Sequence, residues 1–413
     1  MKRNRVVITG IGVLAPNGIG LEQYWQSLLD GRSGIGPITL FDASDLKSQI
    51  AGEVKNFDPT AYIEPELKPK RMARHTQLAY AATIMAFQDA GLDVQDLRLP
   101  SPTPVIIGVS TSAIDVIENV FNVVQDLGPH RTPTTASSAS TPQAPANVIA
   151  DRIGASAHAA TVSAACPSGL DAVADAAAMI RSGEAEVAIA GGSDAPITRL
   201  TMASFIASGL CGAWDSDPQT ASRPFDSSRQ SGVLSEGACI FVLENLERAE
   251  ARAAKIYLEI GGYGKRRDEN PKKPGCGLVE SMKLAMANAK TSPEAIDYIS
   301  AYGPSDRVLD AAEVQYIKQV FGDRSYEIPV SSIKGVTGNP LAAGGPFQLA
   351  ACALSIRDQR IAPTANYRNG DPQCDLDFVP LRSRKIVLNR ALINVRGIGG
   401  SASSMIVNRV AER

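Results

Sequence analysis

Short apolar runs rich in β-branched residues alternate along the chain with longer stretches rich in alanine and leucine. The short runs predict strands, because β-branched side chains favour an extended backbone. They lie at Arg5–Ile11, Val105–Ser110, Thr161–Ala165, Val187–Ala190, Ile240–Leu243, Ile256–Gly261, Ile296–Ala301 and Ile393–Val395. The longer stretches predict helices at Glu22–Leu29, Arg71–Ala90, Gly169–Arg181, Leu309–Phe321 and Pro346–Arg357. Strands separated by helices of this length indicate an α/β fold with parallel sheets between helices.

Two segments suggest an internal duplication. VSAACPSG (162–169) and ISAYGPSD (299–306) both place small residues after an apolar run and then a Pro-Ser turn before a helix. They lie at similar depths in two halves if the boundary falls near Ala254. Because so short a pattern also arises by chance, a chain without duplication stays open at this point.

Two loops are also predicted. Gly128–Ala146 is rich in Pro, Ser and Thr with almost no charge, so we expect another protein surface to cover it. Gly264–Gly275 carries five Lys and Arg residues, which predicts an exposed loop.

Composition narrows the class of protein. The 413 residues include 41 Lys and Arg against 43 Asp and Glu, a net charge of −2 that favours neither nucleic acid nor an anionic membrane. Hydrophobic residues make up 44%, enough for large cores. No run approaches the roughly 18 apolar residues of a membrane helix, and Thr9, Gly10 and Gly12 interrupt the first apolar stretch. We expect a soluble cytoplasmic enzyme.

Neither a metal nor a nucleotide cofactor is expected. The six cysteines lie far apart with no C-x-x-C pair, so reduced thiols are the simplest interpretation. GIGVLA (10–15) fits a dinucleotide-binding fingerprint, but Pro16, Asn17 and Gly18 follow at once and prevent the helix that such a site needs. A tight structural turn is favoured there.

Cys166 carries the strongest local signal for chemistry. It follows an apolar run, and Pro167 stands where a helix would begin. A thiol at a buried helix N-terminus meets the positive end of the helix dipole, which favours the thiolate and hence a nucleophile. A buried structural cysteine is the alternative.

Ordered motifs run nearly from end to end of the chain. They are VVITGIGVLAPNG (6–18), AACPSG (164–169), AIAGGSDA (188–195), SRPFD (222–226), GVLSEGA (232–238), VSSIKGVTGNPLAAGG (330–345), IAPTANY (361–367) and NVRGIGGSAS (394–403). In this order they resemble the elongating, type II β-ketoacyl-acyl-carrier-protein synthases of the thiolase superfamily.

The resemblance implies a thiolase-like fold in which duplicated α/β halves, residues 1–254 and 255–413, form a layered α-β-α-β-α sandwich. It implies a homodimer, or a heterodimer with a related ketosynthase, that accepts acyl thioesters from an acyl carrier protein. Cys166 would be the nucleophile, with the backbone N–H groups of Cys166 and Ile398 holding the oxyanion.

Two positions depart from the family pattern. Tyr302 stands in place of the histidine of H-G-T-S-T, and Asn339 in place of the histidine of T-G-H. The chain has only three histidines, His75, His130 and His158, none in either motif. Lys334 and Glu313 are retained, and we expect them to form a buried charge pair. Ile398 replaces the phenylalanine of the G-F-G loop.

These departures affect the two steps of a condensation reaction, acyl transfer and decarboxylation, differently. Acyl transfer to Cys166 needs only a thiolate and oxyanion donors. Decarboxylation of a malonyl thioester relies in the family on two imidazoles, which a phenol and an amide replace only as hydrogen-bond donors. Three readings follow: an acyltransferase with impaired or altered condensation, a non-catalytic subunit like the chain-length factors, and a condensing enzyme in which Tyr302 and Asn339 substitute well.

Two further segments are weaker candidates for a functional role. The basic run KPKRMARH (68–75) is a candidate docking surface for an acidic carrier protein, although a solvated helix start explains it equally well. Ser168 is better explained as a hydrogen-bonding residue at the start of a helix than as a nucleophile.

Overall fold

A computed structural model describes residues 4–94, 99–100, 102–154, 158–214, 216–269 and 276–410. Within these residues, eleven strands form one sheet in the order β11-β10-β14-β15-β9-β1-β8-β7-β5-β6, with β2 (Gly18–Ile19) paired to β1. The strands are β1 (Val6–Ala15), β5 (Val105–Gly108), β6 (Ala159–Val162), β7 (Val187–Asp194), β8 (Gly237–Asn245), β9 (Leu258–Arg267), β10 (Tyr298–Ser300), β11 (Val330–Ser331), β14 (Arg390–Arg396) and β15 (Ser401–Asn408). The fold is therefore α/β, as predicted. The prediction of parallel sheets is wrong in part, because β5 and β10 pair with their neighbours in parallel but β1, β8, β9 and β15 pair antiparallel.

The sheet consists of two halves with the same arrangement of strands. In each half, the strands lie across the sheet in the order third, second, fourth, fifth and first of that half's own sequence. This order is β6-β5-β7-β8-β1 in the first half and β11-β10-β14-β15-β9 in the second. The halves join where Val7 and Ile8 of β1 pair with Glu259 and Leu258 of β9. The predicted duplication is confirmed.

The two segments that suggested the duplication are not equivalent, however. Residues 162–169 follow β6, whereas residues 299–306 follow β10, which occupies the place of β5 in the second half. The similar Pro-Ser turns arise because both segments lead from a strand into the N-terminus of a helix. That part of the prediction is wrong.

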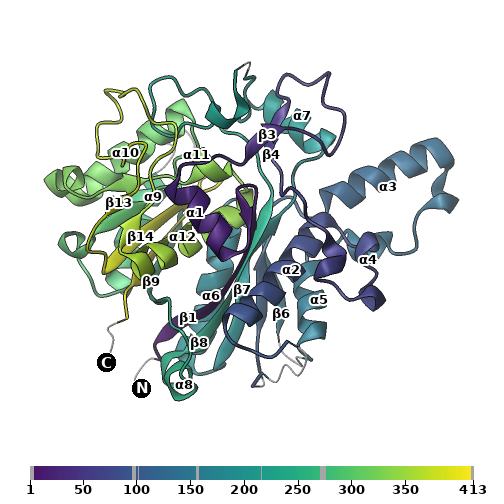
Figure 1. The fold of residues 1–413 in the computed structure, drawn as a ribbon, viewed down its shortest axis with the longest axis horizontal. Helices are drawn as coiled ribbons and strands as arrows, with labels where there is room; N and C mark the ends of the chain where they lie inside the picture. Colours follow the sequence, from purple (N-terminus) through teal and green to yellow (C-terminus); the bar gives the residue numbers. More distant parts are fainter. Residues whose placement is uncertain are drawn as a thin grey trace.

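Helices cover both halves of the sheet and fill the space between them (Figure 1). In the middle layer, α6 (Ser168–Ser182) and α12 (Gly344–Asp358) contact each other and strands of both halves. On the outside, α2 (Arg74–Asp89) and α5 (Ala144–Arg152) cover the first half, while α9 (Cys276–Asn288) and α10 (Arg307–Phe321) cover the second. These are the five layers of the expected sandwich.

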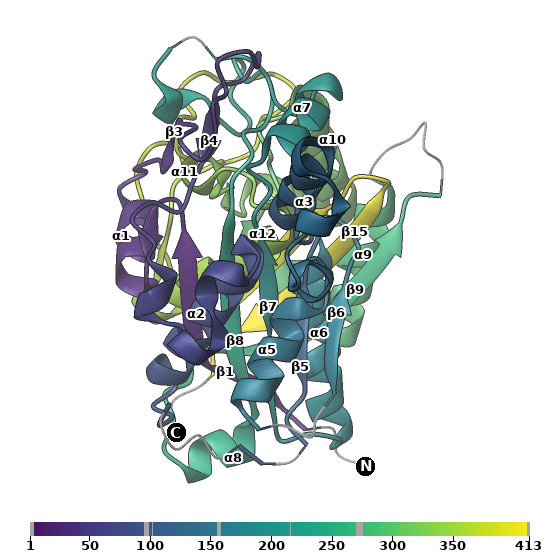
Figure 2. The ribbon, with the colours of Figure 1, turned by 90° about the vertical axis from the view of Figure 1, so that its right-hand side faces the viewer.

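The remaining helices and strands border this core. They are α1 (Leu21–Leu29), α3 (Ile114–Leu127), α4 (Ala136–Ala139), α7 (Arg199–Ala207), α8 (Leu246–Ala251), α11 (Lys334–Thr337), β3 (Ile35–Pro37), β4 (Ile50–Gly52), β12 (Arg360–Ile361) and β13 (Arg384–Lys385). Figures 1 and 2 show α7 and α10 at the same end of the molecule. The loops that carry Cys166 and Tyr302 line a cavity that α7 and α10 also border.

The glycines of GIGVLA lie within a strand, not in the tight turn that was predicted. β1 runs through Val6–Ala15, with an irregular register between Ile8 and Gly10. A Cβ atom at Gly12 would lie 1.8 Å from the carbonyl oxygen of Ala82 in α2, and one at Gly10 would lie 2.2 Å from that of Ala86. Glycine is required here because α2 lies directly on the strand.

Both predicted loops differ from expectation. Strand β9 continues to Arg267, so the first part of Gly264–Gly275 is strand, and residues 270–275 lie outside the described residues. Gly128–Ala146 contains η4 (Pro129–Arg131), α4 and the start of α5, and much of it is exposed in the single chain. The neighbouring α3 projects from the body of the molecule (Figure 1). That another protein surface covers this region stays a prediction.

Candidate active site

The Cys166 segment is a sharp turn between a strand and a helix. β6 ends at Val162, earlier than the predicted Ala165, and α6 begins at Ser168 after its N-cap, Pro167. Ala165 has a positive φ of 61°. The Ser168 hydroxyl accepts a hydrogen bond from Ala164 N at 2.7 Å and donates one to Ala165 O at 2.5 Å. These bonds hold Cys166 at the start of a buried helix.

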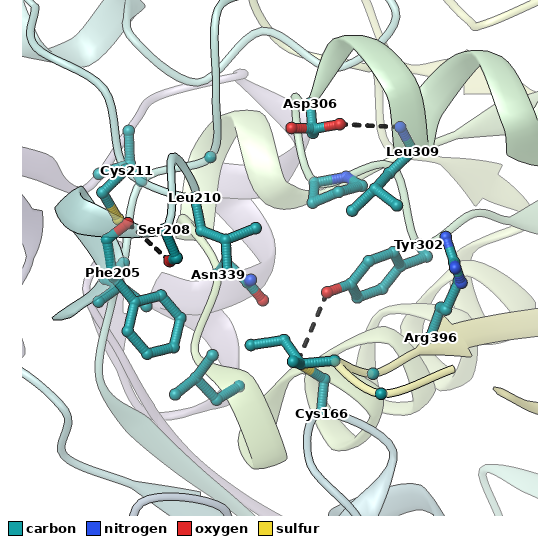
Figure 3. Close-up of a pocket in the computed structure, with 18 of the residues that line it drawn as sticks. Cys166, Phe205, Ser208, Leu210, Cys211, Tyr302, Asp306, Leu309, Asn339 and Arg396 are labelled. Atoms are coloured by element: carbon teal, nitrogen blue, oxygen red, sulfur yellow. Dashed lines mark hydrogen bonds between the residues drawn. The ribbon is translucent and has the colours of Figure 1, made fainter. Parts of the chain in front are cut away.

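A cavity of about 260 Å³ opens beside this turn. It brings together four of the residues singled out in the sequence, which are Cys166, Tyr302, Asn339 and Ile398. Figure 3 shows the Tyr302 hydroxyl pointing toward Cys166, with Asn339 and Leu210 on one side and Arg396 on the other. Residues from both halves of the chain thus line a single cavity.

Tyr302 contacts the thiol directly. Its hydroxyl donates a hydrogen bond to Cys166 Sγ, with the oxygen and sulfur 3.5 Å apart. Only 2% of Cys166 and 6% of Tyr302 are exposed. Burial raises the pKa of the Cys166 thiol, and the hydrogen bond from Tyr302 and the charge of Lys334 oppose that rise. Burial therefore opposes the thiolate preference expected from the helix N-terminus, and that preference stays a prediction.

Lys334 and Glu313 lie on opposite sides of the Tyr302 backbone. The Lys334 amine donates to Tyr302 O at 2.7 Å and lies 4.4 Å from the centre of the Tyr302 ring. The Glu313 carboxylate accepts from Tyr302 N and Gly303 N, both at 2.9 Å. The predicted direct charge pair is absent between these two described residues, because the peptide of Tyr302 lies between them. Instead they fix the position of Tyr302 together.

Burial shifts the pKa of both groups toward neutrality. It lowers the pKa of Lys334 to about 8, against the opposing attraction of Glu313. Burial also raises the pKa of Glu313, while its two backbone N–H donors act the other way. Neither residue lines the cavity, so they support the site from behind Tyr302.

Asn339 is held by its backbone while its side chain faces the cavity. Its N–H donates to Val233 O at 2.8 Å, and its carbonyl accepts from Ser235 N at 3.1 Å. The side-chain oxygen Oδ1 is buried without a hydrogen-bond partner. Burial raises the pKa of Tyr302 well above its ordinary value, and a hydrogen bond from the Asn339 side chain opposes that rise. An unpaired acceptor therefore stands beside Tyr302.

Two charged residues of the cavity were missed in the sequence. Arg396, within NVRGIGG, donates to Asp268 Oδ2 at 3.1 Å. Asp306, within YGPSD, lines the cavity and caps α10 by accepting from Val308 N at 2.9 Å and Leu309 N at 2.8 Å. Asp306 could have been found as an N-cap residue before an apolar helix. A charge beside a glycine turn was the only local signal of Arg396.

The other basic and histidine candidates lie away from the cavity. In KPKRMARH, Pro69–Arg71 form the short helix η3 and Lys68, Lys70 and Arg71 are exposed. His75 is fully buried, and burial lowers its pKa to about 4. None of the three histidines lines the cavity around Cys166.

Comparison with known proteins identifies the family. Residues 3–249 match the family described as "Beta-ketoacyl synthase, N-terminal domain", and residues 257–368 match "Beta-ketoacyl synthase, C-terminal domain". The chain belongs to the β-ketoacyl synthase family.

Relatives extend the match to the full length of the chain. It is 37% identical to 3-oxoacyl-[acyl-carrier-protein] synthase 2 of Synechocystis, with 97% of each protein covered. It is 39% identical to the granaticin polyketide putative β-ketoacyl synthase 1 of Streptomyces violaceoruber, with 99% of each covered. These β-ketoacyl synthases belong to fatty acid and polyketide biosynthesis.

Solved structures agree with this assignment. The ishigamide ketosynthase/chain length factor superposes with a TM-score of 0.92 at 33% identity, covering 99% of this chain and 100% of that one. A type II polyketide ketosynthase in complex with its acyl carrier protein and bound to the hexaketide superposes with a TM-score of 0.91 at 30% identity, with the same coverage. Within the described residues, no helix has the length and apolar character needed to cross a membrane.

Proposed function

We propose that this β-ketoacyl synthase family member is an acyltransferase of fatty acid or polyketide biosynthesis. Cys166 accepts an acyl chain from a carrier-protein thioester, and decarboxylative condensation is impaired or altered. The observation that carries this proposal is the retained Cys166, hydrogen-bonded at 3.5 Å by a tyrosine in a cavity that no histidine lines.

The acylation step uses groups that the site retains. The Cys166 sulfur attacks the thioester carbonyl, and the bond from that carbon to the carrier's sulfur breaks. No carbonyl of another described residue accepts from the backbone N–H of Cys166 or of Ile398, and the Cys166 N–H lies beside its own sulfur, so both groups are candidates to hold the oxyanion. Tyr302 and Lys334 supply the hydrogen bond and the positive charge that favour the thiolate.

The decarboxylation step lacks its usual groups. Tyr302 and Asn339 offer hydrogen bonds to a developing enolate but carry no positive charge. Losing one donor of this kind lowers a rate by roughly 100- to 1000-fold. Partial replacement of two imidazoles therefore leaves slow condensation at most. If the two side chains substitute well, the protein is an ordinary condensing enzyme, and it would release CO₂ from a malonyl thioester after Cys166 is loaded.

A second candidate function is a non-catalytic subunit that resembles a chain length factor and pairs with an active ketosynthase. The missing imidazoles and the raised pKa of the buried Cys166 favour it. The retained nucleophile argues against it. In either case we expect the partner chain to meet the first half of this one, where α3 exposes Phe121 and Leu127, each 61% exposed.

Intact-protein mass spectrometry tests the proposal. The protein is incubated with acyl-carrier-protein thioesters of different chain length, beside the Cys166→Ala variant and a matched Cys352→Ala variant. Cys352 is equally buried but lies in α12, outside the cavity. A mass gain of one acyl group in the wild type and in Cys352→Ala, absent in Cys166→Ala, supports acyl transfer. No gain with any donor favours the non-catalytic subunit.

A further inference from the structure

Polar groups in the cavity lining indicate which kind of molecule accepts the acyl group. Two buried polar atoms of the lining have no partner among the described residues, Asn339 Oδ1 beside the reaction centre and Arg396 Nε, and the half-buried Asp306 carboxylate accepts only from backbone N–H groups of α10 (Figure 3). Arg396 Nε is a donor that suits a carbonyl oxygen, whereas Asn339 Oδ1 and the Asp306 carboxylate are acceptors that suit a donor from the substrate. We propose that the acyl group on Cys166 is transferred to a primary amine, which Asp306 attracts as its ammonium form and Asn339 orients. This inference rests on the proposed acylation of Cys166.

The unpaired oxygen of Asn339 points to a nucleophile that carries hydrogen. Oδ1 is buried in the cavity wall, and leaving such an acceptor without a donor is unfavourable. The carbonyl oxygen of an acyl group or an enolate offers no hydrogen to it. An N–H or O–H group beside the thioester does, and it would stand next to Tyr302, which contacts Cys166.

Asp306 favours nitrogen over oxygen. Its Oδ1 caps α10, and no cation pairs with its carboxylate among the described residues. The nearby Arg229 is occupied by Asp371, at 2.6 Å, and by Asp310. Arg396, the other charged residue of the lining, is compensated by Asp268 at 3.1 Å. The uncompensated charge of the lining is thus negative, which attracts a cationic acceptor.

The lack of an imidazole in the cavity lining favours nitrogen as well. An alcohol must lose its proton to a general base as it attacks, and no imidazole lines the cavity. Burial raises the pKa of Tyr302, so its phenolate is not available for this task. A neutral amine is nucleophilic without a base, and it needs no decarboxylation.

The step is balanced with the groups present. The ammonium ion first loses a proton to water. The amine nitrogen then forms a bond to the carbonyl carbon, and the bond from that carbon to Cys166 Sγ breaks. The nitrogen gives up one proton, Tyr302 passes its own proton to the departing sulfur 3.5 Å away, and the nitrogen's proton restores the Tyr302 hydroxyl. The products are an amide and the free Cys166 thiol.

The test uses the full-length protein after loading by an acyl-carrier-protein thioester. Butylamine and 1-butanol, which match in size, are added separately, and the amide, the ester and the acyl mass left on the protein are measured. Every rate is normalised to the acylated fraction of Cys166, so differences in loading cancel. We expect the amide to form faster than both the ester and the acid released by water.

Two variants separate the roles of the two residues. Asp306→Asn keeps the oxygen that caps α10 and removes the charge, and we expect KM for butylamine to rise about tenfold with a smaller change in kcat. Asn339→Leu keeps the volume and removes Oδ1, and we expect kcat to fall about tenfold. Asp323→Asn, a matched change at an exposed residue outside the cavity, should leave both constants unaltered.

The outcomes distinguish the inference from the proposed function. If Cys166 loads but butylamine is no better than water, or the ester forms faster than the amide, the inference is overturned and acyl transfer to Cys166 stands. A rise in the KM for 1-butanol equal to that for butylamine in Asp306→Asn would also overturn it. Failure of every donor to load Cys166 would overturn the proposed function and the inference together.

Discussion

The Tyr302 hydroxyl lies 3.5 Å from the Cys166 sulfur and donates a hydrogen bond to it. At the two positions where the family resemblance implies histidines, this chain has a phenol hydrogen-bonded to the nucleophile and an amide beside it. The phenol stabilises the thiolate but does not take up a proton near neutral pH. This relationship separates acyl loading, which needs a thiolate, from decarboxylation, which needs stabilisation of an enolate.

Replacing Tyr302 with phenylalanine should slow the loading of Cys166. The hydrogen bond from Tyr302 lowers the pKa of a thiol that burial raises, so its loss moves that pKa further upward. The pH–rate curve for alkylation of Cys166 by iodoacetamide should therefore shift to higher pH. At pH 7 we expect loading about tenfold slower, the effect of one hydrogen bond to a charged group.

Tyr298→Phe is the matched control for this experiment. Tyr298 is also buried, and its hydroxyl is hydrogen-bonded to Ser331 at 2.7 Å, but it does not line the cavity. Its pH–rate curve should coincide with that of the wild type. An unshifted curve in Tyr302→Phe would mean that the 3.5 Å contact has no influence on the thiol.

Restoring both imidazoles should raise decarboxylation. In Tyr302→His combined with Asn339→His, two donors that can carry positive charge would face the enolate formed from a malonyl thioester. Since one such donor is worth roughly 100-fold or more, release of CO₂ should increase by at least that factor. The single Asn339→His variant serves as the control, because it retains Tyr302. An inert double variant would show that missing imidazoles were not the only obstacle.

The features of the site that the sequence predicted are those determined by residues close together in the sequence. Pro167 and the apolar residues after it indicate a helix that starts beside Cys166, and Ser168 bonds the backbone of that turn as expected. The order of motifs was sufficient to place Tyr302 and Asn339 in one cavity with Cys166. Short-range pattern and resemblance were enough for these features.

The parts that were missed depend on contacts between distant segments. Asp268 reaches Arg396 because β9 and β15 pair and bring the end of β9 beside the loop after β14. The glycines of GIGVLA suggested a turn because their need for space comes from α2, about seventy residues away. Lys334 and Glu313 were expected to touch, but the Tyr302 peptide between them is set by the fold of both halves. No local pattern contains these relationships.

Asp194→Asn should destabilise the protein by about 2–3 kcal/mol, the effect of leaving buried donors unpaired. The buried Asp194 carboxylate accepts from Thr111 N at 2.8 Å, from Ser110 N at 3.1 Å and from Ala342 N at 2.8 Å, so it ties β7 to a segment of the second half. An amide has one acceptor oxygen and cannot replace all of these bonds. Urea denaturation measures the difference in the free energy of unfolding.

The same pair of proteins should differ in pH dependence. Burial raises the pKa of Asp194 to about 6 in the folded protein, above its value in the unfolded chain. Protonation of this group therefore favours the folded state, a contribution that is full below about pH 4 and declines as the pH rises through about 6. The wild type should gain stability relative to Asp194→Asn as the pH falls across this window. A pH-independent difference would contradict the assignment.

Gly12→Ala should be among the most destabilising single-methyl changes in the protein. The added Cβ would lie 1.8 Å from Ala82 O and 2.7 Å from Ala86 N, both backbone atoms of α2 that cannot move without displacing the helix from the sheet. Overpacking of this kind typically costs about 1–3 kcal/mol, and we expect the upper end because the clash is with backbone.

Gly370→Ala is the control, since its Cβ would have only Tyr367 Oη nearby, at 3.9 Å, on an exposed loop. Thermal and urea denaturation should show a large loss for Gly12→Ala and a change within about 0.5 kcal/mol for Gly370→Ala. Equal stability of the two variants would mean that α2 does not rest on β1 as closely as these distances require.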